Sequence, residues 1–100
     1  MSEHGPPGIH TEPVVLELGA GAGALVLYAG QELAGREVEV EHRDTGKRTH
    51  TEVHERVVNG RTVFAGVFPE LAEGAYRVLE LGLDVEILSG QVTEVTARSA

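Results

Sequence analysis

The chain has no cysteine and no tryptophan, and only four of its 100 residues are aromatic. Without cysteine it can form neither a disulfide nor a thiolate metal site. With so few rings, the core has to be built mostly from valine, leucine, isoleucine and alanine. A chain of this length is enough for one domain with a single core.

Long apolar runs and positive charge are also scarce. No run approaches the about 20 apolar residues of a membrane span, and Met1–His10 lacks the basic and apolar regions of a signal peptide. We therefore expect a cytoplasmic protein. Eight Lys and Arg stand against sixteen Asp and Glu, for a net charge of −8. This balance disfavours nucleic acid and anionic membranes as partners, because phosphates are bound by Lys and Arg.

The chain divides into a short tail and one domain. Residues 1–13 hold three of the four prolines and are typical of a flexible tail, while residues 14–98 are expected to form a β-sandwich domain. The expected strands are Val14–Leu18, Ala24–Tyr28, Arg36–His42, Arg48–Val58, Thr62–Phe68, Ala75–Leu81, Asp84–Leu88 and Gln91–Ala97. Pro69–Gly74 is expected to be a loop, and the last two strands a hairpin. This spacing predicts an all-β domain of about eight strands, arranged as a sandwich or a barrel.

A glycine-rich segment offers a different interpretation. Val14–Leu18 leads into Gly19-Ala-Gly-Ala-Gly23, which by itself is similar to the cofactor loop of S-adenosylmethionine-dependent methyltransferases. Glycines there would let backbone amides approach the ligand at the start of a helix. The residues that follow read as strands, and about 60 residues after Glu41 are too few for a doubly wound sheet. We therefore expect a connection between two strands.

Several segments together resemble a group of short actinobacterial proteins that are often labelled phospholipase. The likeness is carried by Gly23–Tyr28, Gly35–Val40, Arg48–Arg56, Phe64–Leu71, Gly74–Tyr76 and Gly90–Val95. The second half is also similar to the transthyretin-like or carboxypeptidase-regulatory β-sandwich pattern. The resemblance implies an all-β, seven- or eight-stranded antiparallel sandwich of the prealbumin-like or immunoglobulin-like kind, and no particular activity.

Lipid hydrolysis, which the label alone suggests, has little support in the residues. The serines are Ser2, Ser89 and Ser99, and no Gly-x-Ser-x-Gly elbow surrounds any of them. The residues therefore favour a non-enzymatic protein, with lipid hydrolysis and methyl transfer as the enzymatic alternatives.

The most chemically dense segment is Arg48–Arg56. On one strand, alternation would place Arg48, His50, Glu52, His54 and Arg56 on an outer face and Val53 and Val57 in the core. The turn Asn59-Gly60 would set His54 opposite Ala65, and the turn before Arg48 would set Glu39 opposite His50.

Two hypotheses follow for this outer face. The first is a solvated set of cross-strand charge pairs, each contributing about 0.2–1 kcal/mol. The second is a divalent-metal site made of Glu39, His50, Glu52 and His54, helped by His4 or His10. Residues two apart on a strand are ~6.6 Å apart and could share an ion, whereas His50 and His54 at ~13 Å could not. Apart from such a metal, no cofactor is expected.

Small aliphatic side chains give a third hypothesis. Val63, Ala65 and Val67 would lie on the same outer face as the histidines and could form an interface with a second copy or a protein partner. The sequence thus predicts a small binding or assembly module whose ligand it does not name.

Overall fold

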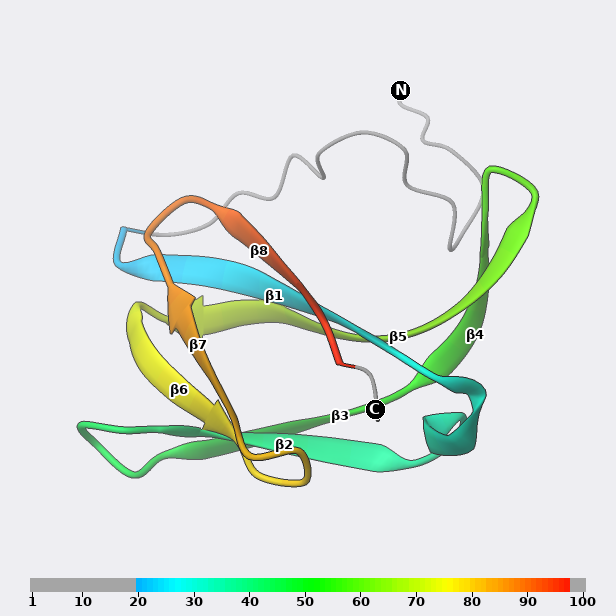
Figure 1. Cartoon of the computed structure of the whole chain (residues 1–100). Coiled ribbons are helices and arrows are strands. Elements are labelled where there is room, and N and C mark those ends of the chain that lie inside the picture. The colour runs from blue at the N-terminus through cyan, green and yellow to red at the C-terminus, as the bar shows by residue number, and fades with distance from the viewer. Residues whose placement is uncertain (1–19, 98–100) are drawn as a thin grey trace.

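Two four-stranded sheets make up the protein. The computed structural model describes residues 20–97, and Figure 1 shows the two sheets stacked one above the other. The strands are β1 (Ala22–Ala29), β2 (Glu37–His42), β3 (Arg48–Glu52), β4 (His54–Val58), β5 (Arg61–Ala72), β6 (Gly74–Val78), β7 (Leu83–Ile87) and β8 (Val92–Thr96), with one 3₁₀ turn, η1 (Gln31–Leu33). The predicted all-β sandwich is confirmed.

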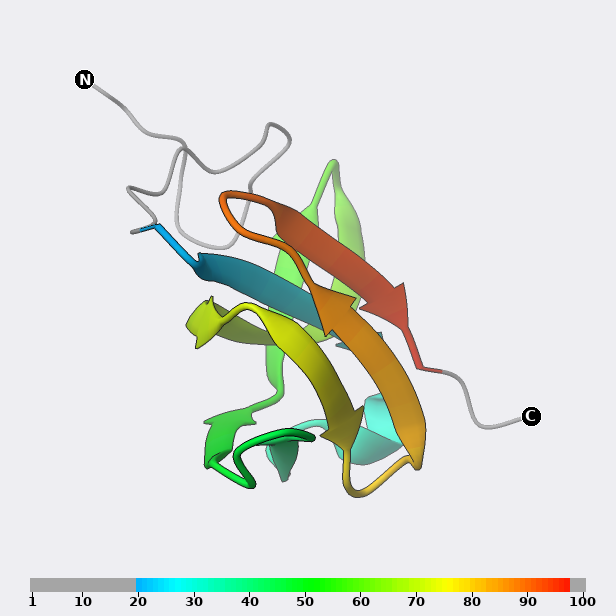
Figure 2. The same ribbon diagram turned by 90° about the vertical axis from the view of Figure 1, so that its left-hand side faces the viewer.

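The strand order explains how the sandwich closes. Sheet A has the order β4-β5-β1-β8, and sheet B has the order β3-β2-β6-β7. All neighbours are antiparallel except β1 and β8, which run parallel. The two sheets and the connections between them are seen from the side in Figure 2. The chain passes between the sheets four times, at β1–β2, β3–β4, β5–β6 and β7–β8.

The core is aliphatic, as the composition predicts. Leu25 and Leu27 of β1 pack with Val38 and Val40 of β2 and with Phe68 of β5, each at most 1% exposed. Alternation in β2 buries its valines and leaves its glutamates outside. A fully buried aliphatic side chain contributes about 1.5–3 kcal/mol, so this two-sided layer accounts for the pairing of the sheets.

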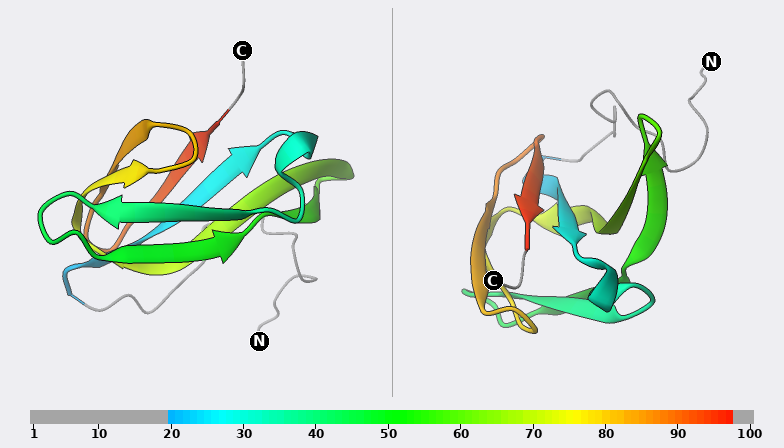
Figure 3. Two further views of the ribbon diagram at one scale, coloured as in Figure 1. Left: turned by 90° about the horizontal axis from the view of Figure 1, so that it is seen from below. Right: turned by 45° about the vertical axis from the view of Figure 1, so that its right-hand side comes forward.

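The segment predicted as one strand, Arg48–Val58, is two strands that belong to different sheets. The break falls at Val53, which is fully buried. Its N–H donates to the Arg36 carbonyl at 2.9 Å, and its C=O accepts from the Gly35 N–H at 2.8 Å. These two bonds hold the chain where it leaves sheet B. The views in Figure 3 follow β3 into β4 across this point.

The expected burial of Val57 is wrong: its side chain is 45% exposed. The β4–β5 hairpin rises away from sheet B (Figure 1), so the side of β4 that carries Val57 has no opposite layer. The prediction assumed that a single face continues from Val53, and the crossing between sheets breaks that assumption.

The expected loop at Pro69–Gly74 is also wrong, because β5 continues to Ala72. A register shift lies between Gly23 and Leu25 of β1, where Gly23 pairs with Leu71 and Leu25 with Phe68. Pro69 falls within this bulge, where a residue without an N–H is tolerated.

The hairpin expected at the end of the chain is wrong: β7 and β8 are joined by a tight turn but do not pair, since β7 lies in sheet B and β8 in sheet A.

The strand expected at Val14–Leu18 and the tail at residues 1–13 lie outside the described residues. The Ala20-Gly21 turn precedes β1, and both edges of β1 are taken by β5 and β8. The helix that a cofactor-binding loop would need after Gly23 is therefore replaced by a central strand.

Candidate functional site

The outer face of sheet B carries the charged residues that the sequence places there. Glu39 lies opposite His50, Glu41 opposite Arg48, and Glu37 opposite Glu52, as predicted. Arg48 contacts Glu41 at 3.5 Å and Glu39 at 4.0 Å. Both carboxylates are about one third exposed, so each such pair contributes little to stability.

The four residues predicted to bind metal are not all brought together. Glu39 and His50 are cross-strand neighbours and Glu52 follows on the same strand, but His54 belongs to sheet A beyond the crossing at Val53. Within residues 20–97, no three His, Asp or Glu side chains are grouped closely enough to hold an ion. His4 and His10 lie outside the described residues. Metal binding stays a prediction.

A second charged group joins the β2–β3 turn to strands β6 and β7 of sheet B. Asp84 of β7 accepts a hydrogen bond from Arg43 at 3.1 Å and faces Arg77 at 3.7 Å. All three side chains are about half exposed or more. They tie the β2–β3 turn to β7 in a solvated setting.

One buried polar residue, His42, was not predicted from the sequence. His42 ends β2 and is 7% exposed, and its ring stacks edge-on against Tyr76 at 4.8 Å. Nδ1 accepts the N–H groups of Asp44 and Thr45, so Nε2 carries the proton and donates to the Glu73 carbonyl at 3.0 Å. The alternation of β2 could have revealed it, because His42 has the same parity as Val38 and Val40. Its contacts are those of a structural residue that ties two turns together.

The outer face of sheet A is apolar along β1 and β5, and it is flanked by Glu94 and Thr96 of β8 on one side and by His54 and Arg56 of β4 on the other. Between β5 and β1, Val67 lies opposite Val26 and Ala65 lies opposite Tyr28. Between β5 and β4, Ala65 lies opposite His54. The predicted interface residues Val63, Ala65 and Val67 therefore share a face with Val26 and Tyr28 of β1, two residues that were not predicted to belong to it. Val63 and Val67 are half-buried, and Ala65 is 1% exposed.

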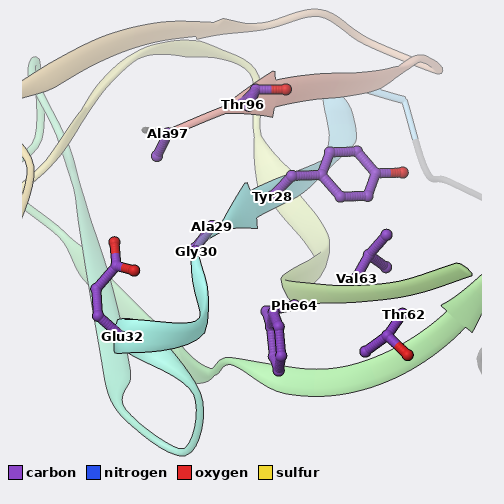
Figure 4. A pocket seen from close by; sticks show the side chains of 9 residues that line it. All are labelled: Tyr28, Ala29, Gly30, Glu32, Thr62, Val63, Phe64, Thr96 and Ala97. Carbon is purple, nitrogen blue, oxygen red and sulfur yellow. The ribbon is translucent and has the colours of Figure 1, made fainter. Parts of the chain in front are cut away.

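Beside this face lies a shallow cavity of about 430 Å³ at the end of sheet A (Figure 4). It is lined by Tyr28, Ala29, Gly30, Glu32, Thr62, Val63, Phe64, Thr96 and Ala97. The lining residues include the aromatic rings of Tyr28 and Phe64, the carboxylate of Glu32, and the hydroxyls of two threonines. Among the described residues, no serine, histidine or aspartate lines it.

Within residues 20–97 the one serine is Ser89, and its hydroxyl makes a contact that is structural. Ser89 lies in the β7–β8 turn, and its hydroxyl accepts the Gly21 N–H at 3.0 Å. This bond ties the turn to the start of β1. Ser2 and Ser99 lie outside the described residues.

The tyrosines give a test of the geometry. Partial burial raises the pKa of Tyr28 above 10.0, and the Glu94 carboxylate, which accepts its hydroxyl at 3.4 Å, raises it further. Burial also raises the pKa of Tyr76, whose hydroxyl donates to the Ala72 carbonyl at 2.7 Å. The sequence has two tyrosines and no tryptophan, so tyrosinate absorbance reports on these two groups alone.

We expect both tyrosines to ionise above pH 10, and Glu94→Gln to lower the midpoint of one of them. Because the folded state holds the proton more tightly than the unfolded state, the stabilisation is present below pH 10 and is lost as pH rises through the folded pKa values. Tyr28→Phe should remove the step that Glu94→Gln shifts. A midpoint for Tyr28 at or below 10 would contradict the contact with Glu94.

Comparison with known proteins identified no relative of this chain. A scan against protein-family models found no match, and searches of curated proteins and of solved structures found none either. The resemblance to transthyretin-like sandwiches and to the phospholipase-labelled group stays a prediction. No helix within residues 20–97 is long and apolar enough to cross a membrane.

Proposed function

We propose that this protein is a non-enzymatic binding or assembly module that contacts other protein chains through the outer face of sheet A. One observation carries the proposal: β1 and the Val63–Phe68 part of β5 are apolar on both of their faces. In β1, Leu25 and Leu27 fill the core while Val26 and Tyr28 point outward. Strands with continuous apolar sequences are typical of sheets that are covered on both sides.

The outward aliphatic side chains form a connected strip. Val67 and Val26 are directly opposite, and Val63 follows beside the pair formed by Ala65 and Tyr28. Single apolar residues on a surface need no explanation, but contiguous ones at the centre of a sheet are typical of interaction sites. The outer face of sheet B, with its glutamates and arginines, is the solvated counterpart. A cytoplasmic setting stays a prediction of the sequence.

Light scattering on the full chain tests this role. If copies associate through the outer face of sheet A, the mass should exceed 10.6 kDa at high protein concentration. Val67→Lys should restore the monomer mass, because a charge at the centre of the face would have to be desolvated. The matched control is Ala75→Lys, which adds the same charge to the outer face of sheet B and should leave the mass unchanged.

Two results would count against assembly. The first is a monomer mass at all concentrations for the unmodified chain. The second is an equal loss of mass in Val67→Lys and Ala75→Lys, since that would trace the effect to net charge and not to this face.

A further inference from the structure

The β4 strand is one of the two edges of sheet A, the other being β8. β4 is the first strand in the order β4-β5-β1-β8 and pairs only with β5. The connecting turn has Asn59 at φ 52° and Gly60 at φ 76°, the two positive values of a type I′ turn. The pair that closes such a turn, Val58 and Arg61, is a hydrogen-bonded pair.

The turn fixes which backbone groups of β4 are unused. Hydrogen-bonded and non-hydrogen-bonded pairs alternate along an antiparallel ladder, so Arg56 and His54 also bond to β5. The N–H and C=O groups of Glu55 and Val57 then point away from it. No residue within 20–97 forms a hydrogen bond with these four groups. They are the positions at which a further strand would pair.

The side chains along this edge specify what could pair there. His54 and Arg56 project on the outer face, and Val57, 45% exposed, projects on the other. A strand laid against the edge would place one residue directly beside Arg56 and one beside Val57. Opposite charge is favourable at the first position and an aliphatic side chain at the second.

A second copy of β4 is a poor match for this edge in the register that would use all four free backbone groups of both copies. In the antiparallel arrangement where Glu55 bonds to Val57 of the other copy, Arg56 meets its own counterpart. That pair is non-hydrogen-bonded, which brings the two side chains closest together, and like charges there are destabilising. Charged residues on an edge strand are a known defence against self-pairing.

We propose that the β4 edge binds an extended segment of a partner protein by strand addition, with an acidic residue beside Arg56 and an aliphatic residue beside Val57. This inference rests on the proposed binding role of sheet A and names the kind of partner. Backbone bonds to Glu55 and Val57 supply the pairing, and the cation–carboxylate contact on the outer face supplies the selection. The overall charge of −8 repels an acidic peptide. A measured preference for an acidic peptide over a basic one would therefore have to come from contacts at the β4 edge.

The probe is the peptide acetyl-Thr-Val-Glu-Thr-Glu-amide, titrated into the labelled full chain and followed by amide NMR shifts. Antiparallel pairing sets its Val beside Val57 and its first Glu beside Arg56. We expect shifts at Glu55 and Val57. The same peptide with both Glu replaced by Lys should bind about fivefold more weakly or worse, which is the scale of one cross-strand charge pair.

Arg56→Glu should reverse this preference, so that the Lys peptide binds more tightly than the Glu peptide. Arg61→Glu is the matched control: it makes the same charge change on β5, and the Glu peptide should still be preferred. N-methylation of the two peptide residues beside Glu55 and Val57 should abolish binding, because it removes N–H donors of the added strand.

Three results would overturn the proposal: equal or tighter binding of the Lys peptide to the unmodified chain, shifts confined to Val63, Ala65 and Val67, or slow amide exchange at Glu55 and Val57 without peptide. Shifts confined to those three residues would leave the proposed function in place. Slow exchange in a dilute monomer would mean that the chain already covers its own edge, and slow exchange that grows with concentration would mean that a second copy does.

Discussion

Replacing Gly23 with alanine is expected to destabilise the fold by about 3 kcal/mol, at the upper end of the usual cost of overpacking. A Cβ at this position would overlap the carbonyl oxygen of Leu88 and lie 2.9 Å from both the Gln91 oxygen and Ile87 Cγ2. Two of these atoms are backbone and cannot rotate away. The β7–β8 turn would have to lift from β1, which would weaken the link between the two sheets.

Urea unfolding followed by circular dichroism measures this loss. The control is Gly21→Ala in the same glycine-rich segment. Gly21 has φ +81° and no neighbour within 4 Å of a built Cβ, so alanine there meets dihedral strain alone, about 1 kcal/mol. Equal losses in the two variants would show that the contact with the β7–β8 turn is not what requires glycine.

Phe68→Ala is expected to cost about 3–5 kcal/mol, the range for deletion of a buried aromatic ring. Phe68 is 1% exposed and the largest of the fully buried side chains, and it faces Leu25 across β5 and β1. A small domain has about 5–15 kcal/mol of stability in total, so this variant should be strongly shifted in thermal unfolding or unfolded at 37 °C.

Phe64→Ala is the matched control, four residues earlier on the same face of β5. Phe64 packs against the core from a half-buried position, so its truncation should cost less. Phe68→Leu, which keeps most of the volume, should cost less than about 1.5 kcal/mol and should fold even if the alanine variant does not. An equal loss for Phe64→Ala and Phe68→Ala would contradict the placement of the core.

Local patterns in the sequence predicted the parts of the fold that depend on neighbouring residues. The alternation of β2 and the Asn59-Gly60 turn led to the correct partners for Glu39 and for His54. In β2 a one-residue slip would have turned the buried valines outward, and in the β4–β5 hairpin the two-residue turn fixes the pairing.

Features set by contacts between distant segments were not predictable in the same way. The break at Val53 depends on the Gly35-Arg36 backbone, and the exposure of Val57 depends on where sheet B ends. The parallel pairing of β8 with β1 leaves no local trace, because Val92–Thr96 reads equally well as the second strand of a hairpin.

The same distinction between local and distant contacts explains which candidate-site residues were placed correctly from the sequence. Glu39 and His50 were placed together because one hairpin contains both. His54 was grouped with them on the assumption of one continuous strand, and the chain crosses to the other sheet before reaching it. The contribution of Val26 and Tyr28 to the apolar face was missed because a central strand shows no alternation.

The parallel pair of β1 and β8 has a consequence for how the protein is made. Tyr28 and Glu94 face each other although 66 positions separate them, so sheet A cannot be completed until β8 has left the ribosome. Until then β1 has an open edge and Val26 lacks its neighbour in β8. Sheets closed by such distant segments fold in about milliseconds to seconds. The nascent chain therefore presents an unpaired apolar strand for most of its synthesis, which is the kind of segment that chaperones bind.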